Sequence, residues 1–296
     1  MQILVTGAAG YIGSHVVKQL LEQTNYEIII IDNLCTGFET TIDTLKSLDS
    51  SNSRIKYYNQ NLSEWEKVED IFKENNIKEI IHFAASLVVP ESVEQPLKYY
   101  LNNTANTANL IQIATKYWVN KFIFSSTAAV YGEPNKEDIP VSETTRTSPI
   151  NPYGSSKLFS ESVIKDTAFA NETFKFVILR YFNVAGADVD GKIGQSTLNA
   201  THLIKVAAET ALNKRSKMSI FGDDYDTQDG TCIRDYIHVC DLADAHLKAL
   251  KYLDTNPSDI FNCGYGYGYS VKEVIDTMKK VSNTDFKVEI VPRRAG

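Results

Sequence analysis

The sequence predicts an α/β fold, a doubly wound parallel sheet followed by a smaller C-terminal lobe. Short, apolar, β-rich runs alternate with longer helical stretches, and a glycine-rich turn follows the first run. Alternation of this kind builds a parallel sheet with helices on both faces. The expected strands are residues 3–6, 28–32, 55–58, 80–83, 122–125 and 176–179.

After about residue 180 the alternation loosens, which indicates a second lobe. Residues 186–194 read as a loop, 197–213 as a helix and 223–231 as a polar, turn-rich segment. A helix over 241–253 and a strand over 260–263 are expected to return to the main sheet. We therefore assign 1–180 to the main domain and 181–296 mainly to the smaller lobe. Ser270 and Glu273 form a capping box that opens a further helix.

Charge and composition exclude several classes of partner. The chain has 37 acidic and 30 basic residues, a net charge of -7 and no dense run of Lys or Arg. It is therefore not expected to bind nucleic acid or a membrane. The first strand begins almost at Met1 and the apolar runs are too short to span a bilayer, so a cytoplasmic protein is expected.

No metal site is predicted. The five histidines form no H-x-x-x-H pair, and the cysteines lie far apart with no C-x-x-C spacing. Reduced structural thiols are the expected state of all four. They are Cys35, Cys232, Cys240 and Cys263.

The glycine-rich turn indicates a dinucleotide site. Gly7, Gly10 and Gly13 stand between the first strand and the first helix, which is expected to follow Gly13. Without side chains, the backbone amides can approach a pyrophosphate at the N-terminus of that helix. Glycines at this spacing could also form only a tight turn. Asp32, at the end of the second strand, adds weight because a carboxylate there accepts from both ribose hydroxyls of NAD and repels the 2′-phosphate of NADP.

A second set of residues predicts proton transfer. Tyr153 and Lys157 share a helix face at i and i+4. Asn151 can cap this helix and Pro152 can occupy its first position. We expect the helix N-terminus and the Lys157 ammonium to lower the pKa of Tyr153 and make it a base. The same spacing also occurs by chance on surface helices.

Three hydroxyls follow the fifth strand, where ligands of doubly wound folds bind. They belong to Ser125, Ser126 and Thr127. One of them can share the proton that Tyr153 moves. The alternative is that this cluster only closes the strand.

These residues resemble the UDP-glucose 4-epimerase family of extended short-chain dehydrogenase/reductases, which have a Rossmann-like fold. The resemblance covers essentially the whole chain, and the motifs occur in the family's order. They are Thr6-Gly-Ala-Ala-Gly-Tyr-Ile-Gly-Ser-His15, Ile31-Asp-Asn-Leu34, Ile81-His-Phe-Ala84, Phe124-Ser-Ser-Thr127, Val130-Tyr-Gly132, Asn151-Pro-Tyr-Gly154, Leu179-Arg-Tyr-Phe-Asn183, Asp229-Gly-Thr231 and Ile233-Arg-Asp-Tyr-Ile-His-Val239.

The resemblance implies NAD-dependent epimerisation at C4 of a UDP-hexose such as UDP-galactose or UDP-glucose. Tyr153 would take the 4-hydroxyl proton with help from Thr127, while Lys157 holds the nicotinamide ribose. A hydride would pass from C4 to NAD and return on the opposite face of a transient 4-keto sugar. The family also implies a homodimer that pairs the helices following Pro96 and Asn151.

The resemblance further implies the two binding sets. The cofactor residues would be Gly7, Gly10, Tyr11, Ile12, Gly13, Asp32, Asn33, Asn61, Leu62, Phe83, Ala84, Ala85, Asn103, Ser125, Tyr153, Lys157 and Tyr181. The residues for the UDP-sugar would be Thr127, Asn183, Asn199, Phe221, Arg234 and Arg294. The planar guanidinium of an arginine suits a diphosphate because it can pair with two oxygens at once.

The sequence departs from the family in three places. Asn61 replaces a common Asp, and Leu87 replaces a lysine that some members have. The sequence ends at Gly296, where members continue with a segment that carries a nucleotide contact and lines the sugar pocket. Ala128 and Ala129 follow Thr127, and without an acidic pair there a dehydratase is disfavoured. UDP-glucuronate epimerases or decarboxylases, and a non-catalytic NAD-binding protein, remain the alternatives.

Overall fold

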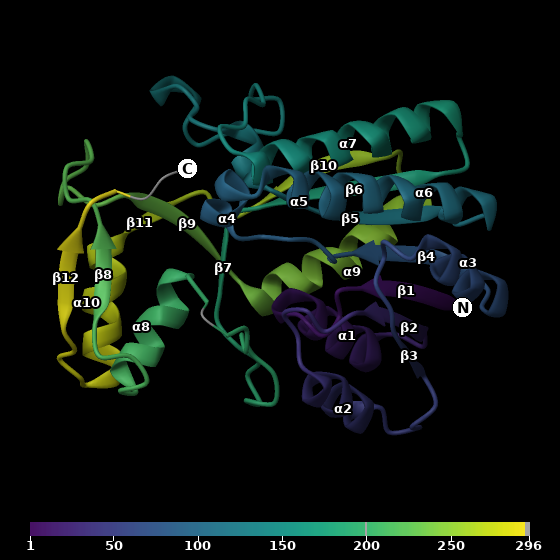
Figure 1. Cartoon of the computed structure of the whole chain (residues 1–296), viewed down its shortest axis with the longest axis horizontal. Coiled ribbons are helices and arrows are strands. Elements are labelled where there is room, and N and C mark those ends of the chain that lie inside the picture. Colours follow the sequence, from purple (N-terminus) through teal and green to yellow (C-terminus); the bar gives the residue numbers. More distant parts are fainter. Residues whose placement is uncertain (199, 294–296) are drawn as a thin grey trace.

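The main body of the protein is a seven-stranded parallel sheet in the order β10-β6-β5-β4-β1-β2-β3 (Figure 1). The computed structural model describes residues 1–198 and 200–293. All six expected strands form, so the predicted doubly wound sheet is confirmed. Its strands are β1 (Gln2–Thr6), β2 (Glu27–Asp32), β3 (Ile55–Asn59), β4 (Ile77–His82), β5 (Lys121–Thr127), β6 (Lys175–Tyr181) and β10 (Asp259–Cys263).

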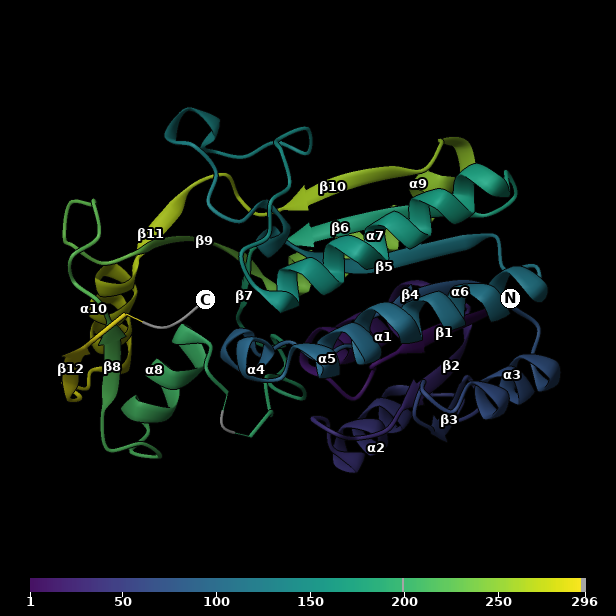
Figure 2. The same cartoon turned by 45° about the horizontal axis from the view of Figure 1, so that its top comes forward.

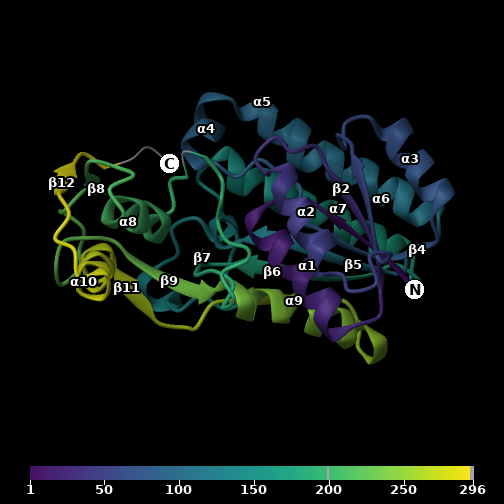
Figure 3. The same ribbon diagram turned by 90° about the horizontal axis from the view of Figure 1, so that it is seen from below.

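Helices cover both faces of this sheet (Figures 2 and 3). One face carries α1 (Tyr11–Gln23), α2 (Glu39–Leu48) and α9 (Val239–Thr255), and the other carries α3 (Trp65–Glu74), α6 (Asn106–Lys116) and α7 (Pro152–Ala170). Side chains alternate between the two cores, as a strand requires. Ile3 and Val5 pack toward α1 and α9, whereas Leu4 packs toward α3 and α6.

One edge of the helical layer is irregular. After α4 (Val89–Glu94), the short helix α5 (Pro96–Tyr99) runs into a π-helical segment, Tyr100–Ala105, which continues as α6. A π-helical turn within an α-helix is rare and frequently marks a functional site. Asn103, one of the predicted cofactor residues, lies inside this turn.

A smaller lobe stands beside the carboxyl edge of the sheet and has its own core (Figure 1). It contains α8 (Leu203–Ala211), β8 (Met218–Phe221), α10 (Val271–Ser282) and β12 (Val288–Val291). Its buried side chains are Ala207, Met218, Ile220, Ile275 and Phe286. A three-stranded sheet of β11 (Gly268–Ser270), β9 (Ile233–His238) and β7 (Asn183–Ala185) runs between this lobe and the main body.

Two helix boundaries differ from the prediction. The first helix begins at Tyr11, because the extended backbone of Gly10 caps it, so Gly13 lies inside the first turn. The helix expected over 197–213 is only Leu203–Ala211, because the apolar face that packs on the lobe core begins at Leu203. The predicted capping box of Ser270 and Glu273 is confirmed.

The described residues lack two features that the sequence also led us not to expect. In the segments 1–198 and 200–293, no helix is both long enough and apolar enough to cross a membrane. Over the same residues, no three His, Cys, Asp or Glu side chains gather as a metal ion would require.

Candidate active site

The predicted catalytic and cofactor residues gather at the carboxyl edge of the sheet. The glycine-rich turn follows β1, Asp32 ends β2, the segment 83–86 follows β4, and the three hydroxyls end β5. Tyr181 ends β6. Neighbouring parallel strands thus present these groups together, at the edge where doubly wound folds bind their ligands.

The glycine-rich turn leaves no room for side chains. Gly7 has φ +73, and a Cβ atom there would lie 2.8 Å from the Ala84 amide nitrogen. A Cβ on Gly13 would lie 2.4 Å from the Gly7 carbonyl oxygen. The start of α1 has no side-chain cap, so its first amides can receive an anion. This turn fits a dinucleotide pyrophosphate.

Asp32 is buried with one amide on each carboxylate oxygen. Oδ2 accepts from the Ala9 amide at 2.8 Å and Oδ1 from the Leu34 amide at 2.8 Å. Burial raises the pKa of Asp32, and the two amides oppose this effect. Each oxygen can accept a further hydrogen bond, so the carboxylate can still receive two ribose hydroxyls.

Four other predicted cofactor residues have local structural roles. Asn33 accepts from the Cys35 amide at 3.1 Å, and Asn61 accepts from the Ser63 amide at 3.0 Å, so both side chains stabilise turns. Leu62 is buried in the core between β4 and α3. Tyr11 donates to the Gly186 carbonyl at 2.6 Å and so ties the glycine-rich turn to the loop after β7.

Asn103 holds the segment 83–86 in place. Its Oδ1 accepts from the Ser86 amide at 2.7 Å, while Nδ2 donates to the Ser86 carbonyl and to Ser156 Oγ, both at 3.0 Å. Both amide protons of Asn103 are therefore used by protein groups, and its Oδ1 keeps one further acceptor position. Its contribution to a cofactor site is to fix the backbone of Phe83, Ala84 and Ala85.

A buried histidine that we did not predict connects the same parts. His82 Nδ1 lies 2.6 Å from Thr6 Oγ1, and Nε2 lies 3.0 Å from Thr107 Oγ1, which donates to the Asn103 carbonyl at 2.6 Å. Burial lowers the pKa of His82 to about 3, so the ring is neutral. The sequence around His82 is an apolar run with a single histidine, and nothing in that pattern indicates which side chains the ring will contact.

The start of α7 agrees with the prediction. Asn151 caps the helix by accepting from the Gly154 amide at 2.9 Å, and Pro152 occupies the first turn. Tyr153 is therefore in the first turn, and its hydroxyl is hydrogen-bonded to Thr127. Lys157 lies one turn later and donates from Nζ to the Ser125 carbonyl at 2.7 Å.

The expected direction of the Tyr153 pKa shift is wrong for the protein alone. Burial raises the pKa of Tyr153, and only the Thr127 hydrogen bond lowers it. Burial also lowers the pKa of Lys157 to about 7, against the charge of Glu161. The reason is that burial removes the hydration of the charged form of each group.

The three hydroxyls at the end of β5 have different partners. Ser125 is hydrogen-bonded to Tyr181, and Ser126 donates to the buried Glu161 carboxylate at 2.5 Å. Thr127 alone contacts Tyr153. Position at the strand end did not rank these three hydroxyls, whereas the family resemblance named Thr127, which is the one that the structure places against Tyr153.

A buried ion pair braces this region. Arg180 on β6 donates to Glu161 on α7 from Nη2 at 2.7 Å and from Nε at 3.1 Å. Arg180 also donates to the Tyr131 hydroxyl at 2.9 Å. Removing one partner would leave a buried charge, so the pair fixes α7 against β6. Nothing in the spacing of Glu161 and Arg180 predicts that they meet.

The residues predicted for the UDP-sugar are placed only in part. Asn183, at the start of β7, is exposed and hydrogen-bonded to Tyr236. Arg234 on β9 is exposed and donates to its neighbour's carbonyl at 2.9 Å. Phe221 ends β8 in the smaller lobe. Asn199 and Arg294 lie outside the described residues.

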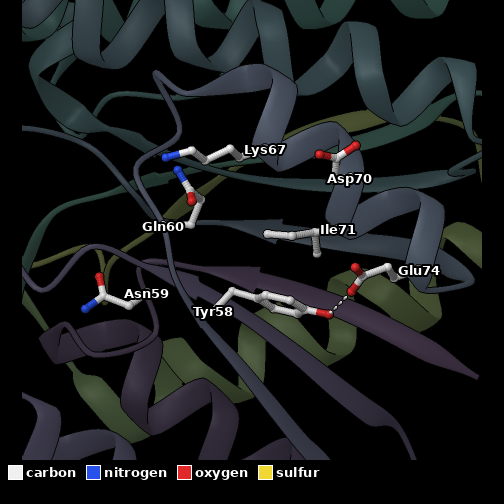
Figure 4. A pocket seen from close by; sticks show the side chains of 7 residues that line it. All are labelled: Tyr58, Asn59, Gln60, Lys67, Asp70, Ile71 and Glu74. Atoms are coloured by element: carbon white, nitrogen blue, oxygen red, sulfur yellow. Dashed lines mark hydrogen bonds between the residues drawn. The ribbon is translucent and has the colours of Figure 1, made fainter.

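A separate hollow lies between β3 and α3, away from the catalytic groups (Figure 4). Its lining is mostly polar, and across it Tyr58 donates to Glu74 at 3.2 Å. It is lined by Tyr58, Asn59, Gln60, Lys67, Asp70, Ile71 and Glu74. None of these residues belongs to the predicted sets.

Comparison with known proteins agrees with this geometry. Residues 3–264 match the model of the NAD dependent epimerase/dehydratase family. The chain belongs to this family. A UDP-glucose 4-epimerase of Azospirillum brasilense is 46% identical over 296 residues, which is 100% of this chain and 81% of that protein.

Solved structures of this family are also similar. The UDP-Glc/GlcNAc 4-epimerase of Campylobacter jejuni is 56% identical with a TM-score of 0.85, covering 99% of this chain and 87% of that chain. The UDP-glucose 4-epimerase of Bifidobacterium longum, solved with NAD+ and UDP, is 38% identical with a TM-score of 0.94. That comparison covers 100% of this chain and 88% of the other.

Proposed function

We infer that this chain is an isomerase, an NAD-dependent 4-epimerase of UDP-hexoses that interconverts UDP-galactose and UDP-glucose. The observation that carries the inference is the convergence of Tyr153, Lys157 and Thr127 at the sheet edge that also holds the glycine-rich turn and Asp32. Curated relatives of 40 to 46% identity, aligned over the chain, are UDP-glucose 4-epimerases.

We propose that Tyr153 takes the proton of the sugar 4-hydroxyl and gives it back in the second half of the reaction. Thr127 stabilises the phenolate by donating to it. Lys157, whose pKa burial lowers to about 7, would hold the nicotinamide ribose as a hydrogen-bond donor. When bound, NAD would supply the acceptor and donor of the hydride. Its oxidised ring would also bring a positive charge that favours the phenolate, which burial alone disfavours.

We propose that residues 1–180 mainly bind the cofactor and residues 181–296 mainly bind the UDP-sugar. The predicted cofactor residues lie on β1 to β6 or directly after these strands, apart from Asn103 on the π-helical turn and Tyr153 and Lys157 on α7. The exposed guanidinium of Arg234 and the amide of Asn183 stand on the sheet between the two bodies. An exposed arginine there suits a diphosphate.

We propose that the chain forms a homodimer through α5, the π-helical turn and α7. Leu97 is 72% exposed, Leu101 65% and Phe159 51%, and Tyr100 packs its ring on Phe159 at 5.8 Å. Neighbouring exposed apolar side chains on packed helices are typical of an interface. Replacing Leu101 with Glu should yield monomers in light scattering, whereas Val281→Glu, on exposed α10, should not.

We propose that the protein works in the cytoplasm. All four cysteines are free thiols, which fits a reducing compartment.

The proposed function is tested by near-ultraviolet absorbance of the purified chain. If it binds NAD and oxidises the sugar at C4, adding UDP-galactose should transiently raise the absorbance of reduced nicotinamide. It should also convert the sugar to UDP-glucose without net reduction. A chain that binds NAD but neither reduces it nor converts UDP-galactose would be a non-catalytic binding protein.

A further inference from the structure

His246 on α9 stands at the end of a buried chain of hydrogen bonds. Its Nδ1 lies 2.8 Å from the Leu242 carbonyl oxygen, and its Nε2 is hydrogen-bonded to the Tyr181 hydroxyl. Tyr181 is hydrogen-bonded in turn to Ser125. His246 has no exposed surface, and Tyr181 and Ser125 are buried as well. These hydrogen bonds therefore connect a helix backbone to Ser125, a predicted cofactor residue, through side chains that are almost entirely buried.

The chemistry of the groups fixes the direction of every bond in this chain. A carbonyl can only accept, so His246 Nδ1 must carry the proton that it shares with Leu242. Burial keeps the ring neutral, so Nε2 has no proton and must accept from Tyr181. The single proton of Tyr181 is then used, and Ser125 must donate its own proton to the Tyr181 oxygen.

One proton of the three neighbouring hydroxyls remains for catalysis. Ser125 gives its proton to Tyr181, and Ser126 gives its proton to Glu161. Thr127 Oγ1 accepts from the Ala129 amide at 3.1 Å, and its proton is left for Tyr153. Of the three neighbouring hydroxyls, only Thr127 can therefore donate into the site, while Ser125 offers lone pairs alone.

We propose that His246 is a positioning residue that keeps the Ser125 proton out of the active site, leaving Thr127 as the sole hydroxyl donor to Tyr153. The inference rests on the proposed function for its catalytic meaning. His246 also packs its ring on Phe83, with centroids 4.8 Å apart, so one side chain supports two predicted cofactor residues. Because His246 lies on α9, its hydrogen bond to Tyr181 also connects that helix to the end of β6 in the site.

The groups around His246 are compatible with a fixed neutral tautomer. It faces Leu242 on its own helix, Tyr181 on β6 and Phe83 after β4, none of which is charged. Cys263 on β10 and Tyr153 on α7 lie near Tyr181, and burial keeps both in their neutral forms. No charge among these neighbours favours a protonated ring.

Nitrogen NMR of the full chain with labelled histidines tests the direction of the bonds without reference to turnover. His246, assigned by the loss of its signal in His246→Gln, should carry a proton on Nδ1 only and should not titrate between about pH 5 and pH 9. A proton on Nε2, or a midpoint inside that range, would overturn the proposal. This result is independent of whether the chain epimerises any sugar.

Two variants and one double variant test the consequence for turnover. His246→Leu removes the group that accepts the Tyr181 proton. Tyr181 then donates to Ser125, and the Ser125 proton is free to point into the site. As a result kcat should fall about ten-fold. His246→Gln restores one donor and one acceptor and should keep kcat within about three-fold of wild type. In a protein that carries Ser125→Ala, His246→Leu should cause no further loss of kcat. Equal losses with and without Ser125, or a Gln variant as poor as Leu, would contradict the positioning role.

Discussion

Tyr153 is the residue on which the proposed chemistry depends. Its hydroxyl contacts Thr127, and its surroundings raise its pKa in the protein alone. Tyr153→Phe should lower kcat by at least about a hundred-fold, since general acid–base groups commonly contribute that much. NAD binding, followed by fluorescence of the reduced cofactor, should be unchanged. Tyr100→Phe, which removes a phenol hydroxyl from the neighbouring helix, is the matched control and should retain wild-type kcat.

Thr127 offers a finer test at the same scale. Thr127→Val keeps the shape but removes the proton that stabilises the phenolate, so kcat should fall about ten-fold. Thr127→Ser keeps the hydroxyl and should be nearly as active as wild type. Steady-state kinetics of both variants measures how much the Thr127 proton contributes to kcat. If the valine variant matches the serine variant, another group shares the proton.

Single residues show where sequence reasoning succeeds and where it stops. The positions of Tyr153 and Lys157 on one helix face follow from their spacing, and the Asn151 cap follows from residue type. The pKa direction of Tyr153 does not, because burial depends on everything packed around the hydroxyl. The role of His246 is equally invisible, since its partner Tyr181 is distant in the chain.

At the scale of elements, the π-helical turn Tyr100–Ala105 is the feature with most bearing on the cofactor site. It places Asn103, whose side chain makes three hydrogen bonds to Ser86 and Ser156. Asn103→Ala should free the segment 83–86 and weaken NAD binding about ten-fold, as measured by equilibrium dialysis. Asn102→Ala, one residue earlier in the turn, should have a smaller effect. Equal affinities of the Asn103 variant and wild type would contradict the assigned role.

Elements with strong periodicity were predictable, and elements shaped by contacts were not. The strands of the main sheet carry apolar runs that identify them directly. The helix over Leu203–Ala211 was predicted too long, because only contact with Met218 and Ile275 defines its apolar face. The π-helical turn gives no sequence signal, since its register depends on the Asn103 contacts with α7 and the segment 83–86.

For the whole molecule, two buried histidines predict sensitivity to acid. Burial lowers the pKa of His82 to about 3 and that of His246 to about 4, whereas both titrate near 6.5 when unfolded. The unfolded chain therefore binds more protons below pH 6.5, and stability should fall as the pH drops from about 6.5 to about 4. Each histidine contributes about 1.4 kcal/mol per pH unit in that window. Urea unfolding at several pH values should show a shallower dependence for His246→Gln than for wild type. An unchanged dependence would mean that His246 is not neutral in the fold.

The arrangement of two bodies around one edge of a sheet also explains the proposed reaction as a whole. The glycine-rich turn and the proposed base, Tyr153, belong to the seven-stranded body, and Arg234 and Phe221, proposed to bind the UDP-sugar, belong to strands on the other side. A nucleotide-sugar held by the second set would place its hexose at the first. Tyr153 would then reach the sugar in both halves of the proposed epimerisation.

The most direct test of this account is proton and deuterium NMR of UDP-galactose deuterated at C4, incubated with the purified chain. The account predicts UDP-glucose with the deuterium still at C4, because the hydride passes to bound NAD and returns to the same carbon. Tyr153→Phe should leave the label and the sugar unchanged. Conversion with loss of deuterium to water, or no conversion of UDP-galactose with NAD present, would contradict it.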